Sequence, residues 1–300
     1  MTTDVSTPPA SDSVDPTLDE KLGKLRGLVR DLGSAIVCFS GGIDSALLVA
    51  VAHGELGDRA LAVTAVSPSL PTSERLESSR IAAEIGARHE LIDSHEIENP
   101  SYAANNADRC FHCKTELYSL SQAEAQSRGF AHVLAGIIVD DLGDYRPGIE
   151  AARSHGVRFP LVEAGFQKAD VRAAAGLLGL TIWDKPAAAC LSSRIAYGTP
   201  VTPARLARVD GLETDLKALG FRIVRVRYHE LETGPSHVIF ARIELGSDEL
   251  SRATSSPIRE QIVAAGKEHG FHFVTLDLAG YRTGSQNELL GVRRRLPMVQ

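Results

Sequence analysis

The sequence is poor in aromatic residues and in cysteine, and it contains no long hydrophobic run. Only 5% of its 300 residues are aromatic and four are cysteine, too few for a disulfide framework, which favours a reducing, cytoplasmic environment. The apolar stretches are too short to cross a bilayer, and no charged start precedes an apolar core at the N-terminus, so neither a membrane span nor a signal peptide is expected. The net charge of −6 gives no indication of a nucleic-acid surface.

What is present is the composition of an ordinary globular protein, with 43% hydrophobic and 23% charged residues. Residues 1–14 are rich in Ser, Thr, Pro and Asp and are expected to form a disordered tail. Over residues 15–198 apolar segments alternate with segments of helical spacing, which indicates an α/β domain with a doubly wound parallel sheet. Residues 199–300 change to the order helix, strand, strand, helix, strand, which predicts a smaller α+β domain.

The expected elements can be placed approximately from the hydrophobic periodicity. In the first domain, strands are expected over 35–39, 60–66, 89–92 and 131–136, with helices over about 15–32, 46–52, 72–85 and 110–128. In the second, a helix is expected over 203–219, strands over 222–228, 238–245 and 271–276, and a helix over 248–265 that breaks at Pro257. Because ligands of parallel sheets bind beyond the carboxyl ends of the strands, the segments after residues 39 and 136 are candidate sites.

The most informative segment is Ser40-Gly41-Gly42-Ile43-Asp44-Ser45, which stands between an expected strand and an expected helix. Its two glycines allow a tight turn whose amides, together with the positive end of the new helix, point at one spot. Its two serines add hydroxyl donors, and Asp44 could hold Mg²⁺ against phosphate oxygens. The segment resembles the PP-loop of ATP pyrophosphatases, which split ATP between the α and β phosphates and adenylate a substrate.

Cys190 is the second candidate for chemistry. Small residues precede it, so that a ligand could approach, and Arg194 would favour its thiolate if the two side chains lie close together. A thiolate beside an adenylated carboxylate would displace AMP and form a thioester. A small buried cysteine at the end of a helix or loop is the alternative interpretation.

Four motifs together resemble those of a known family. They occur in the order Ser40-Gly41-Gly42-Ile43-Asp44-Ser45, Arg109-Cys110-Phe111-His112-Cys113-Lys114, Asp140-Asp141-Leu142-Gly143-Asp144-Tyr145-Arg146-Pro147-Gly148 and Cys190-Leu191-Ser192-Ser193-Arg194. The combination is similar to the LarE family, ATP-dependent sacrificial sulfur transferases that help build the nickel-pincer cofactor of lactate racemase. The resemblance extends from about residue 20 to about residue 285, and its last three motifs are more specific than the first.

The resemblance implies a definite reaction. ATP and Mg²⁺ serve to adenylate a carboxylate of pyridinium-3,5-biscarboxylic acid mononucleotide, and the cysteine matched by Cys190 forms a thioester. Cleavage of its Cβ–S bond leaves the sulfur on the substrate and dehydroalanine in the protein, so each chain acts once. The resemblance also implies a homo-oligomer, a trimer or a hexamer, which no pattern in the sequence proves.

Some relatives instead hold a four-iron cluster on three cysteines and recycle sulfur through it. Here Cys190 has no other cysteine nearby in the sequence, so a cluster would have to recruit Cys110 and Cys113. This Cys-x-x-Cys pair could also be half of a zinc site, but no second pair has matching spacing. Packing at the start of a helix is the role favoured for the pair.

Several polar residues are candidate ligands for ATP. Arg109 and Lys114 could bind its phosphates, with a solvated helix face as the alternative. Asp140 and Asp141, part of an acidic cluster with Asp144 and Arg146, could bind Mg²⁺ or fix the nucleotide. Relatives usually carry an asparagine within the segment at Gly136. This chain has Ile137 and Ile138 there, so it is expected to lack one polar contact to the nucleotide.

The candidate substrate site falls mainly in the second domain. Arg225 and Arg227 alternate on one expected strand, so they project from one face and suit a phosphate or carboxylate. An exposed strand face is the alternative. The family uses such an Arg-x-Arg pair with acidic partners that match Glu213 and Glu244, and the candidate set also includes Ser193 and Arg194 from the cysteine motif.

Three other functions remain open from the sequence. A PP-loop synthetase would use ammonia in place of a cysteine, and it would turn over without Cys190. A tRNA thiolase of the same superfamily would usually show a basic face, which the net charge of −6 disfavours. A non-enzymatic nucleotide-binding protein would bind ATP without releasing pyrophosphate.

Overall fold

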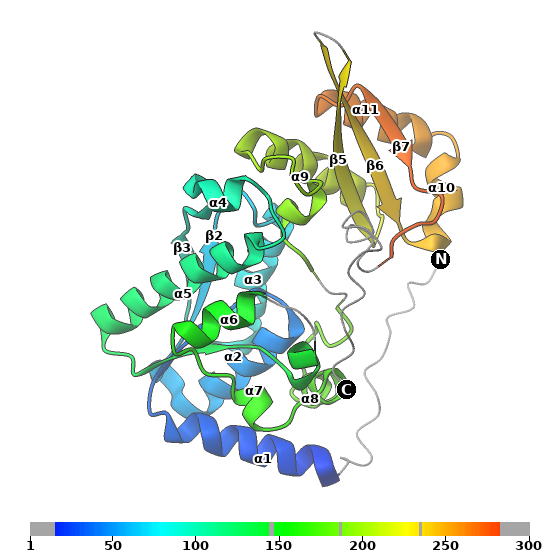
Figure 1. Ribbon diagram of the computed structural model, residues 1–300. Coiled ribbons are helices and arrows are strands. Elements are labelled where there is room, and N and C mark those ends of the chain that lie inside the picture. Colours follow the sequence, from blue (N-terminus) through cyan, green and yellow to red (C-terminus); the bar gives the residue numbers. More distant parts are fainter. Residues whose placement is uncertain (1–15, 144–146, 186–187, 234–235, 283–300) are drawn as a thin grey trace, which may run out of the picture. The chain divides into compact units, whose positions relative to one another are not determined.

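Figure 1 shows the computed structural model of the protein, which describes residues 16–143, 147–185, 188–233 and 236–282. The expected tail over residues 1–14 and two members of the acidic cluster, Asp144 and Arg146, lie outside these ranges. The chain forms two compact units. The first comprises Met1–Ser67, Glu74–Glu96 and Cys110–Ala188, and the second comprises Pro68–Ser73, Ile97–Arg109 and Ala189–Gln300. Residues 189–198 therefore group with the second unit.

The first unit is built on a four-stranded sheet whose strands are all parallel. Its strands, in the spatial order β3-β2-β1-β4, are β1 Ala35–Cys38, β2 Ala60–Val66, β3 His89–Asp93 and β4 His132–Ala135. The central strand β1 is buried throughout, as its apolar sequence requires of a strand covered on both faces. The parallel sheet expected from the sequence is confirmed.

Helices cover both faces of this sheet (Figure 1). They are α1 Pro16–Asp31, α2 Ile43–Leu56, α3 Thr72–Ile85, α5 Arg109–Arg128, α6 Pro147–Ser154, α7 Pro160–Glu163 and α8 Lys168–Leu177. Because successive strand residues point to opposite faces, Ala35 and Val37 join the core with α1, α2 and α8. Ile36 and Cys38 join the opposite core with α5 and α6. This arrangement confirms the doubly wound fold.

The second unit is built on a three-stranded sheet of order β5-β6-β7, in which β5 and β6 are antiparallel and β6 and β7 are parallel. Its elements are α4 Pro100–Ala103, α9 Pro203–Ala218, β5 Val224–Thr233, β6 Ser236–Leu245, α10 Leu250–Thr254, α11 Ile258–Glu268 and β7 Phe273–Leu276. Thr202 caps α9 by accepting a hydrogen bond from the amide of Arg205 at 3.3 Å. The expected helix over 248–265 is divided, as predicted, at Pro257.

Within the described ranges, no helix combines the length and the apolar character that crossing a membrane requires.

Candidate active site

The loop between β1 and α2 is held by hydrogen bonds among its own residues. The hydroxyl of Ser45 donates to the carbonyl of Gly42 at 2.9 Å, and its oxygen accepts from the amide of Ser40 at 3.3 Å. The hydroxyl oxygens of Ser40 and Ser45 lie 3.2 Å apart. Since the Ser45 proton points to Gly42, Ser40 is the donor of this pair. The loop thus keeps its shape through its own polar groups.

Two positions at this site require glycine, one because of its backbone conformation and the other because of close packing. Gly41 has φ of +70°, a conformation that side chains with a Cβ rarely adopt. Gly136 follows β4, and a Cβ placed on it would lie 2.7 Å from the backbone nitrogen of Ser45. The end of β4 therefore presses against the first turn of α2, which brings the two segments expected at the ligand edge into contact.

Two lysines that the sequence analysis did not single out lie beside the loop. The ammonium of Lys168 contacts both carboxylate oxygens of Asp44 at 2.8 Å, and the amide of Lys168 donates to Asp140 at 3.0 Å. Lys185 donates to the carbonyl of Gly41 at 3.0 Å and also pairs with Glu74 at 2.8 Å. Lys185 supports the loop backbone, whereas Lys168 neutralises the carboxylate of the loop itself.

The other residues expected to bind ATP in this unit have partners of their own. Asp141 accepts a hydrogen bond from the amide of Ile138 at 3.1 Å, so its carboxylate shapes the turn after β4. Lys114 lies in α5 under the start of α6, where a Cβ on Gly148 would meet its Cγ at 2.8 Å. Burial alone would lower the pKa of Lys114, but electrostatic attraction by Tyr118 and by the neighbouring cysteines raises it above the ordinary value. Lys114 therefore keeps its positive charge in the first unit.

In the second unit, Cys190 precedes the short 3₁₀ segment Leu191–Arg194, which contains two of the expected substrate-binding residues. The carbonyl of Cys190 accepts hydrogen bonds from the Ser193 amide at 3.0 Å, the Ser193 hydroxyl at 2.7 Å and the Arg194 guanidinium at 3.0 Å. These bonds fix the backbone, while the side chain is half-exposed. The thiol thus stands on a rigid turn.

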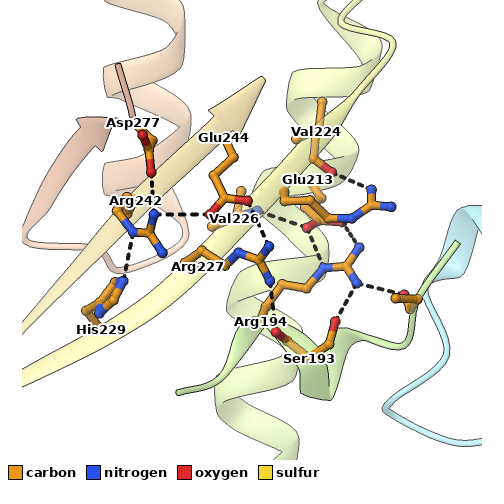
Figure 2. A network of polar contacts seen from close by, with 12 residues as sticks. Ser193, Arg194, Glu213, Val224, Val226, Arg227, His229, Arg242, Glu244 and Asp277 are labelled. Atoms are coloured by element: carbon orange, nitrogen blue, oxygen red, sulfur yellow. Dashed lines mark hydrogen bonds and ion pairs between the residues drawn. The ribbon is translucent and has the colours of Figure 1, made fainter. Parts of the chain in front are cut away.

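Arg194 and Glu213 form a buried ion pair that supports this turn (Figure 2). Two parallel hydrogen bonds of 2.9 and 3.1 Å join their side chains, each only 2% exposed. Glu213 also accepts from the amide of Val226 at 2.9 Å and so connects α9 to β5. Burial by itself would lower the pKa of Arg194, but the attraction of Glu213 raises it, so Arg194 stays positively charged.

A second set of linked ion pairs and hydrogen bonds extends across β5 and β6 (Figure 2). Arg227 donates to the carbonyl of Ser193 at 2.9 Å and to Glu244 at 2.7 Å, and the other Glu244 oxygen lies 3.1 Å from Arg242. Arg225 lies on the same strand as Arg227, two residues away. The pKa of Arg225 is lowered mainly by burial and also by repulsion from Arg194. The sequence-predicted arginines and glutamates therefore belong to one connected network.

Arg109 lies in this second unit rather than with the loop after β1. Its guanidinium donates to the carbonyl of Ser192 at 2.9 Å and also to the side chain of Asn105. Tyr102 and Ser192 are joined by a 2.6 Å hydrogen bond between their hydroxyls. Arg109 thus holds the segment after Cys190, and its contact with a nucleotide stays a prediction.

Among the residues that the structure describes, no three or more His, Cys, Asp or Glu side chains come together in a group that could hold a metal ion.

The parallel sheet and the strand–loop–helix unit at residues 35–56 define a PP-loop α/β protein. No protein-family model matches the chain. It is 42% identical over 273 residues to an uncharacterized protein of Synechocystis sp., covering 91% of this chain and 99% of the relative. It is 38% identical over 275 residues to pyridinium-3,5-bisthiocarboxylic acid mononucleotide synthase of Lactiplantibacillus plantarum, covering 91% and 96%. An uncharacterized protein of Methanocaldococcus jannaschii is 27% identical over 249 residues. The chain belongs to the LarE family.

Proposed function

We propose that the protein is a sulfur transferase that converts pyridinium-3,5-biscarboxylic acid mononucleotide to its thiocarboxylate with sulfur from Cys190. The observation that carries the proposal is the end-to-end similarity to the synthase of L. plantarum, whose name specifies the bisthiocarboxylic product. Two local features support it: the shaped loop after β1, and the half-exposed thiol on a rigid turn. The site of action is the cytoplasm, where a thiol stays reduced.

The proposed chemistry has three steps. A substrate carboxylate oxygen attacks the α-phosphorus of ATP, and pyrophosphate leaves. The Cys190 thiolate then attacks the acyl carbon of the adenylate, a thioester forms and AMP leaves. Finally a base removes the Cα proton of Cys190, the electron pair forms a Cα–Cβ double bond, and the Cβ–S bond breaks. The thiocarboxylate departs with the sulfur, and dehydroalanine remains in the chain.

We assign the nucleotide phosphates to the segment Ser40–Ser45, where backbone amides and the start of α2 favour anions. Asp44 presents one carboxylate there, and Lys168 already neutralises it. One carboxylate suits a Mg²⁺ ion that arrives with ATP, because Mg²⁺ takes most of its remaining ligands from phosphate and water. We include Lys168 in this site and keep Lys114, Asp140, Asp141 and Arg109 as proposed contacts of ATP.

We assign the substrate phosphate to Arg225 and Arg227. Both belong to a network in which the described residues include four arginines and three carboxylates, namely Arg194, Arg225, Arg227 and Arg242 with Glu213, Glu244 and Asp277. Positive charge is therefore in excess among these residues. Burial is the main cause that lowers the pKa of Arg225, and repulsion from Arg194 adds to it. A phosphate dianion would relieve this repulsion, while Ser193, Arg194, Glu213 and Glu244 keep the two arginines in place. We further propose that the protein acts as a homo-oligomer, a trimer or a hexamer.

The decisive test is the intact mass of the protein before and after incubation with ATP, Mg²⁺ and the biscarboxylated substrate. We expect the loss of the elements of one H₂S, mapped to Cys190, together with thiocarboxylate, AMP and pyrophosphate. Cys190→Ala should release pyrophosphate but yield no thiolated product, whereas Cys38→Ala, which changes a buried cysteine of β1, should retain the transfer.

Other outcomes would redirect the assignment. Thiolated product without a change of mass would mean an external sulfur donor or a cluster. Ammonia-dependent turnover by Cys190→Ala would favour the synthetase class and contradict the proposal.

A further inference from the structure

Tyr281 lies beside the arginines of the candidate substrate site and has no role in the reaction proposed above. The guanidinium of Arg225 lies over its ring, with the central carbon 5.2 Å from the ring centroid. Tyr281 also interacts electrostatically with Arg194, and all three residues belong to the second compact unit. An aromatic ring at this distance attracts a guanidinium to its electron-rich face. The ring thus helps to hold one of the two side chains to which the substrate phosphate is assigned.

The backbone before Tyr281 forms a turn that fixes this residue against β6. The amide of Tyr281 donates to the carbonyl of Leu245, the last residue of β6, at 2.7 Å. The preceding Gly280 has φ of +67°, and a Cβ on it would lie 3.0 Å from the same carbonyl oxygen. The amide of Gly280 donates to the carbonyl of Asp277 at 3.1 Å, and the Asp277 carboxylate pairs with Arg242. Tyr281 is therefore held in place both by β6 and by the charged network itself.

The hydroxyl group of Tyr281 still has a proton to donate. It forms no hydrogen bond with any residue that the structure describes, and the side chain is half-exposed. Guanidinium groups carry donors only, so neither Arg194 nor Arg225 can accept the phenol proton. An anion that binds among these arginines would supply the missing acceptor, and a hydrogen bond to a charged acceptor is about twice as strong as one between neutral groups.

We propose that Tyr281 is a substrate-binding residue whose hydroxyl donates a hydrogen bond to the phosphate of the mononucleotide, beside Arg225 and Arg227. This role rests on the proposed function, which assigns the phosphate to these two arginines. A phosphate monoester has three terminal oxygens and a carboxylate has two, so a donor added to two guanidinium groups favours the phosphate. Tyr281 thereby selects the phosphate end of the substrate over its carboxylates, which leaves the carboxylates for adenylation.

Equilibrium binding to the full chain without ATP measures this contact before any chemistry takes place. The two ligands are pyridinium-3,5-biscarboxylic acid mononucleotide and the matching nucleoside, which lacks the phosphate. Tyr281→Phe should weaken binding of the mononucleotide by roughly tenfold, because a hydrogen bond to a charged group is lost, and should leave binding of the nucleoside unchanged.

Tyr228→Phe provides the matched control. Tyr228 also lies against an arginine, with the central guanidinium carbon of Arg205 5.6 Å from its ring centroid, but its hydroxyl already contacts Glu230 at 3.3 Å. The loss of this hydroxyl should leave both affinities unchanged. Thermal melting checks that each variant is folded.

Several outcomes would overturn this role of Tyr281. Equal weakening of both ligands by Tyr281→Phe would mean that only the packing of the site had changed. A loss in Tyr281→Ala that Tyr281→Phe does not share would mean that the ring acts on Arg225 and that the hydroxyl contacts nothing.

Arg225→Gln separates these outcomes from a failure of the proposed function. If Arg225→Gln abolishes the preference for the mononucleotide and Tyr281→Phe retains it in full, the phosphate assignment stands and the role of Tyr281 is wrong. If the unaltered protein binds the nucleoside as tightly as the mononucleotide, the phosphate assignment is itself wrong, and the role of Tyr281 is wrong with it.

Discussion

Lys168 and Asp44 are joined by two contacts of 2.8 Å, one from the ammonium nitrogen to each carboxylate oxygen. The pair connects the first residue of α8 to the first turn of α2. Asp44 alone would present a negative charge at the place where the loop amides favour a phosphate. Because Lys168 compensates that charge, we infer that the loop can receive an anion. In the proposed reaction this lysine would stabilise the phosphate charge that develops as pyrophosphate departs.

Replacement of Lys168 should therefore impair the first chemical step. We expect Lys168→Ala to lower the rate of pyrophosphate release by roughly 10²-fold, the usual effect of losing one charged donor at a developing anion. Lys168→Arg should recover part of the rate. Pyrophosphate release under saturating ATP measures the effect.

Lys21→Ala provides the matched control. Lys21 of α1 pairs with Asp170 of α8 at 2.6 Å, and within the described residues its side chain forms no ion pair with Asp44. Its loss should leave pyrophosphate release unchanged. Equal losses in the two variants would mean that Lys168 acts only by stabilising α8.

Gly136→Ala should disturb the loop through packing alone. The added Cβ would lie 2.7 Å from the nitrogen of Ser45, so the start of α2 must shift. We expect a loss of about 1–3 kcal/mol in the free energy of unfolding and weaker ATP binding. Gly176→Ala is the control, since a Cβ there meets nothing within 4 Å, and it should be neutral or stabilising. Denaturant unfolding and ATP titration of both variants measure the difference, and equal effects would contradict this account.

The sequence predicted the parallel sheet, because each strand and the Ser40–Ser45 turn are local patterns. It did not reveal Lys168 and Lys185, which lie 124 and 144 residues from their partners in the loop. No local signal separates these lysines from others on helix or loop surfaces. Helices α6 and α7 also escaped prediction, since eight and four residues are too short to show a helical period.

The candidate substrate site was predicted by two different routes. Arg225 and Arg227 follow from strand alternation, which is a rule of local geometry. Glu213 and Glu244 came only from the family resemblance, because the pairing of α9 and β6 with these arginines is a tertiary relationship. The structure connects Glu213 to Arg194 and Glu244 to Arg227, which gives both glutamates a physical reason for their burial.

Breaking the Arg194–Glu213 pair should destabilise the second unit strongly. Arg194→Met leaves the Glu213 carboxylate buried without its cation, so we expect a loss of about 3–5 kcal/mol in the free energy of unfolding. Arg194→Met with Glu213→Leu should recover part of this loss, because no charge is then buried alone. Arg128→Ala breaks a pair with Glu90 whose side chains are more than a third exposed, so its effect on the free energy of unfolding should be far smaller. Similar losses in Arg194→Met and Arg128→Ala, measured by denaturant unfolding, would refute this view.

His89 should make the stability of the protein depend on pH. Its Nε2 lies 2.8 Å from the hydroxyl of Thr64, which donates to the carbonyl of Phe39 at 2.7 Å, so Nε2 carries the proton of the neutral ring. Burial lowers the pKa of His89 below its ordinary value of 6.5, despite the opposing attraction of Glu90. Above pH 6.5 the ring is neutral in both states, and the full contribution to stability is present. As the pH falls below that value, the unfolded chain binds a proton first, and the free energy of unfolding decreases until the folded pKa is passed.

His89→Gln keeps a donor for Thr64 but cannot titrate, so we expect a smaller loss of stability between about pH 7 and pH 5 than in the unaltered protein. Some slope should remain, because burial and the nearby Arg242 also lower the pKa of His229. Denaturant unfolding at several pH values measures both slopes. Identical slopes would show that His89 takes up its proton as readily in the folded chain as in the unfolded one, and would remove it as the source of the pH dependence.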